Sequence, residues 1–458
     1  MKHTKIICTI GPASESVTTL TKMMKAGMDV ARLNFSHGTY EYHGQLITNI
    51  RAAAAKAKKS ILILQDLQGP RIRIGNVAPE GVMIKNGQMV TVVPQKSYDA
   101  KNPNQLPSDY PDLAGAVKAG LHVLIADGVM DIEVTKVVGE AIYGRVVAGG
   151  VVKSHKGINV PGGVFTARSL TTKDKKDIEF GISQNVDLVA MSFVRNGEDI
   201  RDVKQAIAKA VGKRKDVTFP GVVAKIELPS AVDNIDEIIV ESDAIMVARG
   251  DLGIEAPISH LPLIQKELIM AARMAGRPVI VATQMLESMI VNRRPTRAEA
   301  TDVANAVCDG TDAIMLSGES ANGAYPVEAV ETMAEIAEQA EQTICSLMCN
   351  EDAEMAQLSP AQAIACMVSS LTEQKKVGAV VVAEGDDELL RALSSFRPAA
   401  PVVVMGEVTV SSEAYRLAWG VVECPESKNI RALLVKMGVI AAGDCIVGVT
   451  GQSLHFID

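Results

Sequence analysis

Eight short apolar segments recur along the chain, each rich in β-branched residues and each ending in polar residues or glycine. They cover residues 5–11, 29–36, 61–67, 186–194, 221–227, 243–251, 278–285 and 312–320. Continuous apolar runs are typical of strands that are buried on both faces of a parallel sheet. Helical patterns separate most of them, and one of these patterns ends on Gly276, a common helix stop. The repeat predicts an α/β fold, a (β/α)8 TIM barrel.

A stretch of different composition interrupts this alternation of strands and helices after the third strand. It contains Asn86-Gly87, a hairpin turn signal, and it is rich in short strands and glycines. We expect a small inserted β-barrel domain at the top of the third strand, where it overhangs the active face of the barrel as a lid. The predicted division gives residues 1–74 and 162–340 to the catalytic barrel and residues 75–161 to the lid.

The pattern changes again after the barrel. A polar linker, CNEDAEMAQLSP, leads into alternating strand and helix patterns such as VGAVVVAE, DDELLRALSSF and APVVVMGE. This alternation predicts a separate C-terminal α/β domain over residues 355–458.

Charge and hydropathy exclude several classes of protein. The net charge is −8 with both signs interspersed, which argues against a nucleic-acid surface. No apolar run approaches the ~18 residues needed to span a bilayer, and the N-terminus lacks a signal-peptide pattern. The 7 scattered cysteines favour reduced thiols. We therefore expect a cytoplasmic protein with no membrane and no nucleic-acid partner.

Polar side chains gather at the C-terminal ends of the predicted strands, where barrel enzymes place their function. Strand by strand, the set comprises Arg32, Asn34, Ser36 and His37, then Asp66, Arg71 and Arg73, then Lys225 and Glu227, then Gly250 and Asp251, and Thr283. Because alternate residues of a strand share a face, the side chains of Lys225 and Glu227 point to the same side.

This set combines cations for an anion with carboxylates for a metal. The arginines and Lys225 can surround a phosphate, while Glu227 and Asp251 offer oxygen ligands to one hard divalent cation such as Mg²⁺. Backbone N–H groups at Gly250, where the chain enters a helix, can bind a carboxylate or a phosphate. Charges placed in this way favour phosphoryl transfer. The sequence has neither a G-x-G-x-x-G nor a G-x-x-x-x-G-K-[ST] motif, so any nucleotide is held in another way.

Taken singly, each of these residues has an ordinary structural explanation. A lone charged residue at a strand end is usually a solvated cap or part of a surface ion pair, and His37 could be a partly buried structural histidine. Lys173 lies in TTKDKKD, which is typical of a capped and solvated helix start, although its side chain can reach the rim. The concentration of so many charges on one rim favours the functional explanation.

Six segments resemble the pyruvate kinase family. They are ARLNFSHG (31–38), KGINVPG (156–162), AKIE (224–227), VARGDLGIE (247–255), VATQMLESM (281–289) and RRPTRAEATDVANAVCDGTDAIMLSGESA (293–321). The resemblance covers essentially the whole chain in order, and the length of the motifs makes it specific. It implies phosphoryl transfer from phosphoenolpyruvate to ADP, giving pyruvate and ATP in glycolysis.

The resemblance also implies roles for the residues that contact phosphoenolpyruvate and the metal. Arg32 and Lys225 would hold the transferring phosphoryl group, and Lys225 would stabilise its transition state. Glu227 and Asp251 would bind Mg²⁺ or Mn²⁺. The carboxylate of phosphoenolpyruvate would bind Gly250, Asp251 and Thr283, with Thr283 near the path of enol protonation.

The remaining rim residues would line the phosphates of the nucleotide. By matching motif, or by reach over the rim, these are Asn34, Ser36, His37, Arg73, Lys156 and Lys173. The usual assembly of the family is a homotetramer, and the segment RRPTRAE (293–299) is expected near a subunit contact.

One departure from the family concerns a monovalent cation. Many members read Asp-Thr-Lys-Gly-Pro-Glu-Ile-Arg-Thr where this chain has DLQGPRIRI, so Arg71 replaces a glutamate. Members with that glutamate resemble enzymes that require K⁺, which Asn34, Ser36, Asp66 and the carbonyl of Leu67 would coordinate. A fixed guanidinium can supply the positive charge of such an ion. We therefore expect K⁺ not to be required, with Arg71 as its substitute.

The other departures concern loop geometry and regulation. KIELPSAV lacks the usual Asn and acidic-Gly residues after Glu227, which puts the geometry of that loop in question. AEGDDE (383–388) stands where members activated by a sugar bisphosphate carry a Ser/Thr-Gly phosphate loop, and its acids would repel phosphate. The sequence ends in TGQSLHFID, without the longer Gly/Ser/Thr loop before the last strand. We expect no activation by fructose 1,6-bisphosphate.

Two other functions remain open. The chain could be a non-catalytic metabolite-binding homologue, although the retained rim residues speak against this. It could also be another Mg-dependent barrel that handles pyruvate or enolpyruvate, which would turn over without ADP.

Overall fold

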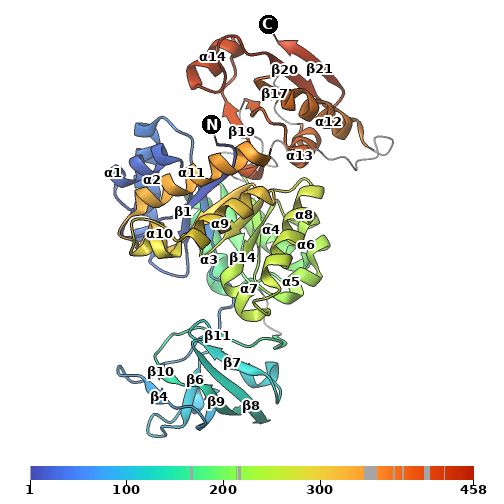
Figure 1. The fold of residues 1–458 in the computed structure, drawn as a ribbon. Helices are drawn as coiled ribbons and strands as arrows, with labels where there is room; N and C mark the ends of the chain where they lie inside the picture. The colour runs from blue at the N-terminus through green and yellow to red at the C-terminus, as the bar shows by residue number, and fades with distance from the viewer. Residues whose placement is uncertain are drawn as a thin grey trace.

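The computed structural model describes residues 2–457 except 166–168, 213, 215–217, 345–357, 375–376, 384–385, 407–412 and 428. Figure 1 shows the barrel in the middle, the inserted lid at one end and the C-terminal domain at the other. The fold is mixed α/β, as predicted.

The central element is a closed barrel of parallel strands in the order β1-β16-β15-β14-β13-β12-β3-β2. Its strands are β1 (Lys5–Thr9), β2 (Val30–Asn34), β3 (Leu62–Asp66), β12 (Leu188–Met191), β13 (Gly221–Ile226), β14 (Ala244–Ala248), β15 (Val279–Ala282) and β16 (Ala313–Leu316). Each lies within one of the predicted apolar segments, so the (β/α)8 prediction is confirmed.

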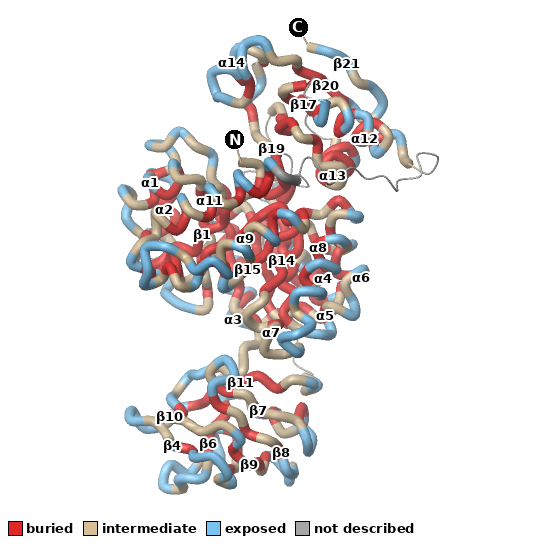
Figure 2. The backbone as a smooth tube through the Cα atoms, in the orientation of Figure 1, coloured by how far each residue is buried: buried red, intermediate tan, exposed pale blue. Residues whose placement is uncertain are grey.

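Helices cover the outside of the barrel. They are α1 (Val17–Ala26), α2 (Tyr40–Ala57), α3 (Thr172–Ser183), α4 (Gly197–Val211), α6 (Ile235–Glu241), α8 (Leu261–Met274), α9 (Arg297–Cys308) and α11 (Pro326–Ile344), with the short α5 (Pro229–Asp233), α7 (Arg249–Glu255) and α10 (Gly318–Ala321). Alternate side chains of each strand pack into two cores, one inside the barrel and one between the strands and the helices. In β1, Ile7 packs inside the barrel, whereas Ile6 and Cys8 pack against the helices. Figure 2 shows the strands buried and the outer helix faces exposed.

The inserted segment forms the lid. Its strands are β4 (Val82–Ile84), β5 (Met89–Pro94), β6 (Gln105–Ser108), β7 (His122–Ile125), β8 (Met130–Val138), β9 (Ala141–Ala148), β10 (Gly150–Val152) and β11 (Ile158–Asn159). Six of them pair in the order β11-β7-β8-β9-β5-β6. The entering chain closes this curved sheet, because Arg73 bridges Gly157 beside β11 and Ile74 bridges Ser108 of β6. The lid core includes Val92, Ile125 and Ile142.

The C-terminal domain is a sheet in the order β19-β18-β17-β20-β21, with only β21 antiparallel. Its strands are β17 (Ala379–Ala383), β18 (Val402–Met405), β19 (Val421–Cys424), β20 (Ile446–Thr450) and β21 (Ser453–Ile457), and its helices are α12 (Pro360–Glu373), α13 (Asp387–Phe396) and α14 (Ile430–Met437). A 3-10 turn, η5 (Glu413–Leu417), places Ala414 and Leu417 in the cluster that fills the barrel interior. The domain therefore plugs the end of the barrel that lies away from the lid.

None of the described helices is both long enough and apolar enough to cross a bilayer.

Candidate active site

The C-terminal ends of the barrel strands face the lid, and Asp66 lies at the centre of their charges. Its side chain is 1% exposed, with Oδ2 at 2.7 Å from Arg32 Nε and Oδ1 at 3.2 Å from Lys225 Nζ. Burial by itself would raise the pKa of Asp66, but the charges of Lys225 and Arg32 outweigh it and lower the pKa. The carboxylate thus holds two cations side by side at the rim.

Each of the two cations has further partners that fix its direction. Arg32 Nη1 donates to Thr9 Oγ1 at 2.7 Å. Lys225 Nζ donates to Ser192 Oγ at 2.6 Å and lies 2.8 Å from Glu227 Oε1. Burial by itself would lower the pKa of Lys225, yet Asp66 and Glu227 raise it above its ordinary value. Lys225 therefore stays protonated at neutral pH and presents a positive charge.

Glu227 and Asp251 form the candidate metal site. Glu227 is 1% exposed, and its Oε2 accepts the backbone N–H of Phe193 at 2.7 Å. Burial raises the pKa of Glu227, Lys225 opposes this, and the charge of Asp251 raises the pKa further. Two carboxylates that repel each other are stabilised by a divalent cation, and oxygen is the donor that Mg²⁺ prefers. Ligation by two protein carboxylates, completed by waters or substrate oxygens, fits Mg²⁺. In the described part of the chain, no group of three or more His, Cys, Asp or Glu side chains is arranged to hold a metal ion.

Thr283 lies beside the start of α7, in a strained backbone. Its φ is 74° and that of Gln284 is 53°, a left-handed conformation that is costly for a β-branched residue and is concentrated at functional sites. Thr283 Oγ1 accepts the N–H of Gly250 at 2.8 Å. The sequence suggested a bare N–H at Gly250, but here that group is already bonded. The other N–H groups in the first turn of α7 have no partner within the helix.

The stretch after β3 brings Arg71 between the lid and Asp251, one of the two carboxylates of the candidate metal site. Gly69 has a φ of 66°, and a Cβ there would lie 3.0 Å from both Phe193 and Ser192, so the turn requires glycine. Arg71 Nη2 lies 3.4 Å from Asp127 Oδ1 of the lid and 4.0 Å from Asp251 Oδ1. The structure gives Arg71 these partners, rather than the four residues of the expected monovalent-cation site.

Those four residues have other partners. Asn34 Oδ1 accepts the N–H of Ser36 at 3.1 Å, Asp66 holds Arg32 and Lys225, and the Leu67 carbonyl accepts from Ser192 Oγ at 2.7 Å. Of the oxygens that would coordinate an ion, those of Asn34, Asp66 and Leu67 therefore already have partners, whereas Ser36 contributes only its backbone N–H.

The residues expected to line the nucleotide phosphates lie on the same rim, near the end of β2 and near the segments that connect the lid to the barrel. Burial lowers the pKa of His37, and the charges of Arg73, Arg71 and Arg32 lower it further. Lys173 Nζ donates to the Phe35 carbonyl at 2.7 Å and to buried Asp177 at 2.6 Å.

Lys156 is exposed just before β11, and its carbonyl accepts from the N–H of Ile74 at 2.8 Å. The backbone of Lys156 is thus hydrogen-bonded within the lid, and its side chain lies at the surface.

Sequence reasoning missed three residues of this network. Ser192 follows β12, and reading the end of that strand as the others were read would have found it. Thr9 ends β1 and was overlooked in the same way. Asp127 comes from a lid turn between β7 and β8, and no local sequence signal links that turn to the rim.

Part of the stretch AEGDDE can be followed in the C-terminal domain. Asp386 caps α13 through the N–H of Leu389 at 3.1 Å and accepts the N–H of Gly451 at 2.8 Å. Glu384 and Gly385, on which the expectation about sugar bisphosphates partly rests, lie outside the described residues.

Known proteins resemble this chain over almost all of its length. The family model "Pyruvate kinase, barrel domain" matches residues 1–330. A pyruvate kinase from Geobacillus stearothermophilus is 41% identical over an aligned length of 462, and the match covers 98% of this chain and 78% of that protein. "Pyruvate kinase 2" of Synechocystis is 42% identical over 424 residues, 92% of this chain and 70% of that protein.

A solved structure agrees with these relatives. The crystal structure of a pyruvate kinase from Cryptosporidium parvum superposes with a TM-score of 0.90 at 34% identity, covering 100% of this chain and 96% of that one. With its closed barrel, inserted lid and charged rim, the chain belongs to the pyruvate kinase family.

Proposed function

We propose that this chain is an active pyruvate kinase, which transfers a phosphoryl group from phosphoenolpyruvate to ADP and yields pyruvate and ATP. The observation that carries the proposal is the pair of cations, Arg32 and Lys225, held by buried Asp66 beside Glu227 at the rim under the lid. Phosphoryl transfer depends mainly on positioning and on charge stabilisation, which fixed and desolvated cations supply.

In this mechanism Arg32 and Lys225 bind the oxygens of the transferring phosphoryl group. Both cations are oriented before substrate arrives, since Asp66, Thr9 and Ser192 hold them. Lys225 stays charged because its pKa is raised by Asp66 and Glu227 against the effect of burial. Its charge stabilises the negative charge on the phosphoryl oxygens during transfer.

The carboxylate of phosphoenolpyruvate binds near Gly250, Asp251 and Thr283, at the first turn of α7. Because Thr283 Oγ1 accepts from the Gly250 N–H, its own hydroxyl proton remains available for donation. When the phosphoryl group leaves, the enolate takes up a proton at its methylene carbon and becomes pyruvate. Thr283 orients the donor of that proton, a role for which its rigid, strained backbone suits it.

A divalent cation, Mg²⁺ or Mn²⁺, would be held by Glu227 and Asp251. When bound, it neutralises charge on the phosphoryl and carboxylate oxygens of the substrate. The nucleotide phosphates would lie between the lid and the residues Asn34, Ser36, His37, Arg73, Lys156 and Lys173.

We further propose that activity does not require K⁺, because Arg71 supplies the charge. Support comes from the position of its guanidinium, 4.0 Å from Asp251, the proposed metal ligand, and from the partners that the oxygens of Asn34, Asp66 and Leu67 already have. Rates in Na⁺, K⁺ and tetramethylammonium buffers of equal ionic strength should agree. Arg71→Glu should make the enzyme depend on K⁺, whereas Arg71→Lys should not; a strict K⁺ requirement in the unaltered enzyme would refute the idea.

The decisive test of catalysis is pyruvate formation in a coupled assay with phosphoenolpyruvate, ADP and Mg²⁺. Lys225→Met should lower kcat by about 100-fold or more, since one preorganised charge is lost. Lys209→Met, on the exposed face of α4, is the matched control. No turnover would leave a metabolite-binding homologue, and turnover without ADP would identify another enolpyruvate-handling barrel.

The finer features of the protein follow the same family pattern. We propose that the protein is cytoplasmic and forms a homotetramer, with the exposed segment 293–299 near a subunit contact. Each chain would comprise the barrel (residues 1–74 and 162–340), the lid (75–161) and the C-terminal domain (355–458). We also propose that fructose 1,6-bisphosphate has no effect, because Asp386 already occupies the first turn of α13. A leftward shift of the phosphoenolpyruvate curve on adding this sugar would contradict that.

A further inference from the structure

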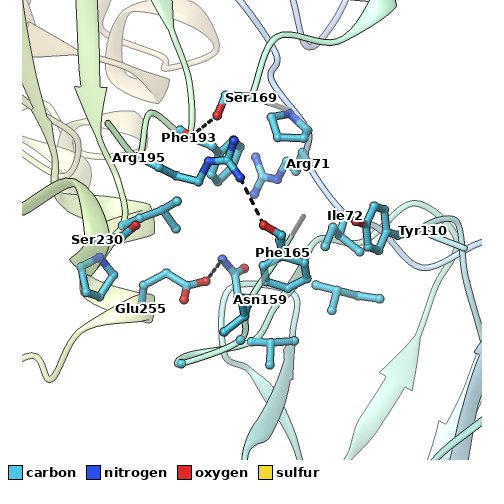
Figure 3. Close-up of a pocket in the computed structure, with 18 residues that line it drawn as sticks. Arg71, Ile72, Tyr110, Asn159, Phe165, Ser169, Phe193, Arg195, Ser230 and Glu255 are labelled. Carbon is cyan, nitrogen blue, oxygen red and sulfur yellow. Dashed lines mark hydrogen bonds between the residues drawn. The ribbon is translucent and has the colours of Figure 1, made fainter. Parts of the chain in front are cut away.

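A cavity of about 360 Å³ lies where the lid meets the barrel. One wall includes Tyr110 and Val160 of the lid, together with Ile72 and Phe165, which flank the lid and pack against its core. The barrel wall includes Leu228 and Pro229. Figure 3 shows the open space between these walls. The residues that form the chemistry of the rim, Arg32, Lys225, Glu227 and Thr283, do not line it. Mostly apolar cavities of this size with a few converging polar groups are typical of sites for small organic ligands.

The barrel wall comes from the loop that departs from its family. Leu228 follows the metal carboxylate Glu227, and Pro229 opens α5. Their apolar side chains stand at the mouth of an active site, next to exposed Ser230. The altered loop thus changes the surface beside the rim, while Glu227 keeps its partners in Phe193 and Lys225.

Two guanidinium groups lie at one end of the cavity, and they are compensated unequally. Arg195 donates to Asp199, with Nη2 at 3.2 Å from Oδ1, and its Nη1 donates to the Phe165 carbonyl at 3.1 Å. Arg71 is 33% exposed, and its nearest carboxylates are Asp127 at 3.4 Å and Asp251 at 4.0 Å. Figure 3 shows both arginines directed toward the same end of the space. Arg71 is therefore the cation that can bind an anion there.

Among the described residues that line the cavity, the one acid is Glu255, and Figure 3 shows it away from the two arginines. Glu255 accepts from Asn159 Nδ2 of the lid at 2.9 Å, and burial raises its pKa. An anionic ligand would thus place its charge at the end with Arg71 and its apolar body between Phe165 and Leu228.

We infer that this cavity binds an aromatic or similarly apolar monocarboxylate, and that the bound molecule lowers catalytic activity. The carboxylate of the ligand pairs with Arg71, so that the guanidinium compensates the charge of Asp251 less. The apolar body of the ligand contacts both walls. Because one wall is lid and the other is barrel, an occupied cavity fixes the lid against the barrel and slows the motion that admits substrate and releases product. Binding itself does not depend on the proposed catalytic activity.

The test uses three probes of one shape, 2-naphthoate, 2-naphthalenemethanol and 2-naphthylmethylammonium, titrated by calorimetry. We expect 2-naphthoate to bind one molecule per chain, at least about tenfold more tightly than either analogue, since only its carboxylate can accept charge-assisted hydrogen bonds from the Arg71 guanidinium within an apolar cavity. Ser230→Phe fills the cavity and should weaken naphthoate binding at least about tenfold, whereas Ser230→Ala should not. Hydrogen exchange should slow at residues 158–165 and 228–230 on binding.

Each result decides the matter. Equal affinity for the three probes, preference for the ammonium, absence of binding, or unchanged binding to a folded Ser230→Phe variant would overturn the inference. Circular dichroism of both Ser230 variants checks that they are folded. In the assay of pyruvate formation, naphthoate should lower kcat without competing with phosphoenolpyruvate. Failure of the catalytic proposal would instead appear as no turnover in the absence of any probe.

Discussion

The barrel is joined to other parts of the chain at both of its ends, and the two joints are built differently. At the lid end, the contacts include Asn159 with Glu255 at 2.9 Å and Arg71 with an exposed Asp127 at 3.4 Å, and they border an apolar cavity. At the other end, Arg397 and Asp312 form an ion pair with side chains only 8% and 1% exposed. There Leu417 also packs into the barrel interior.

This difference separates a movable joint from a rigid one. A hydrogen bond to a carboxylate contributes about 1.5–3 kcal/mol and an exposed ion pair about 1 kcal/mol or less, so opening the lid should cost less than separating the other joint. A buried pair and an apolar plug are lost only when the domains come apart. We therefore expect the joint at the charged rim to open more easily than the joint with the C-terminal domain.

The largest expected effect comes from breaking the rigid joint. Arg397→Met leaves buried Asp312 without its ion-pair partner and should destabilise the protein by about 3–5 kcal/mol. Urea unfolding, followed by the fluorescence of Trp419, the single tryptophan, measures it. Lys96→Met removes an exposed pair whose members are 65% and 55% exposed and should cost less than about 1 kcal/mol. Similar costs for the two variants would contradict the contrast.

Acid should weaken the same joint through His3. This ring packs edge-on against Trp419, with the centroids 4.2 Å apart. Burial, assisted by the charge of Lys5, lowers the pKa of His3 from 6.5 to about 4. Between these values the unfolded chain binds a proton that the folded chain does not, so stability falls as the pH decreases from 6.5 to 4, by roughly 2–3 kcal/mol.

Comparison with a variant isolates this contribution. His3→Phe keeps a ring against Trp419 but cannot titrate, so its unfolding free energy should fall less steeply over the same pH range. Parallel curves for the two proteins would show that His3 does not control the joint.

The smallest change in stability is expected at the lid. Asn159→Ala removes one hydrogen bond to Glu255, and the global unfolding free energy should fall by about 1.5 kcal/mol, the lower end of the range for a hydrogen bond to a carboxylate. Amide exchange in β11 should nevertheless become faster, because local opening is easier. A loss of stability as large as that of Arg397→Met would mean that the lid joint is also rigid.

The sequence predicted what depends on local pattern. Buried strands need continuous apolar runs, so the barrel could be predicted, and alternation placed Lys225 and Glu227 on one side of β13. A capped helix start in TTKDKKD was also expected, with Thr171 or Thr172 as the cap, and Thr171 forms a capping box at the start of α3.

What escaped prediction depends on contacts between distant segments. Asp127 approaches Arg71 only because the closed lid sheet directs the β7–β8 turn toward the rim. The bond between Gly250 and Thr283 depends on the strained turn after β15. The docking of Leu417 in the barrel interior joins segments that no local pattern connects.

The closure of the lid sheet by Arg73 and Ile74, here called its seam, has an electrostatic consequence. Arg73 is part of that seam, since it bridges Gly157 beside β11, and its charge contributes to lowering the pKa of His37 on the barrel. A swing of the lid therefore moves a cation toward or away from the rim. The potential that a phosphate meets on entry becomes a function of the lid angle, so attraction for polyanionic substrates is greatest when the cleft is shut and falls as it opens to release product.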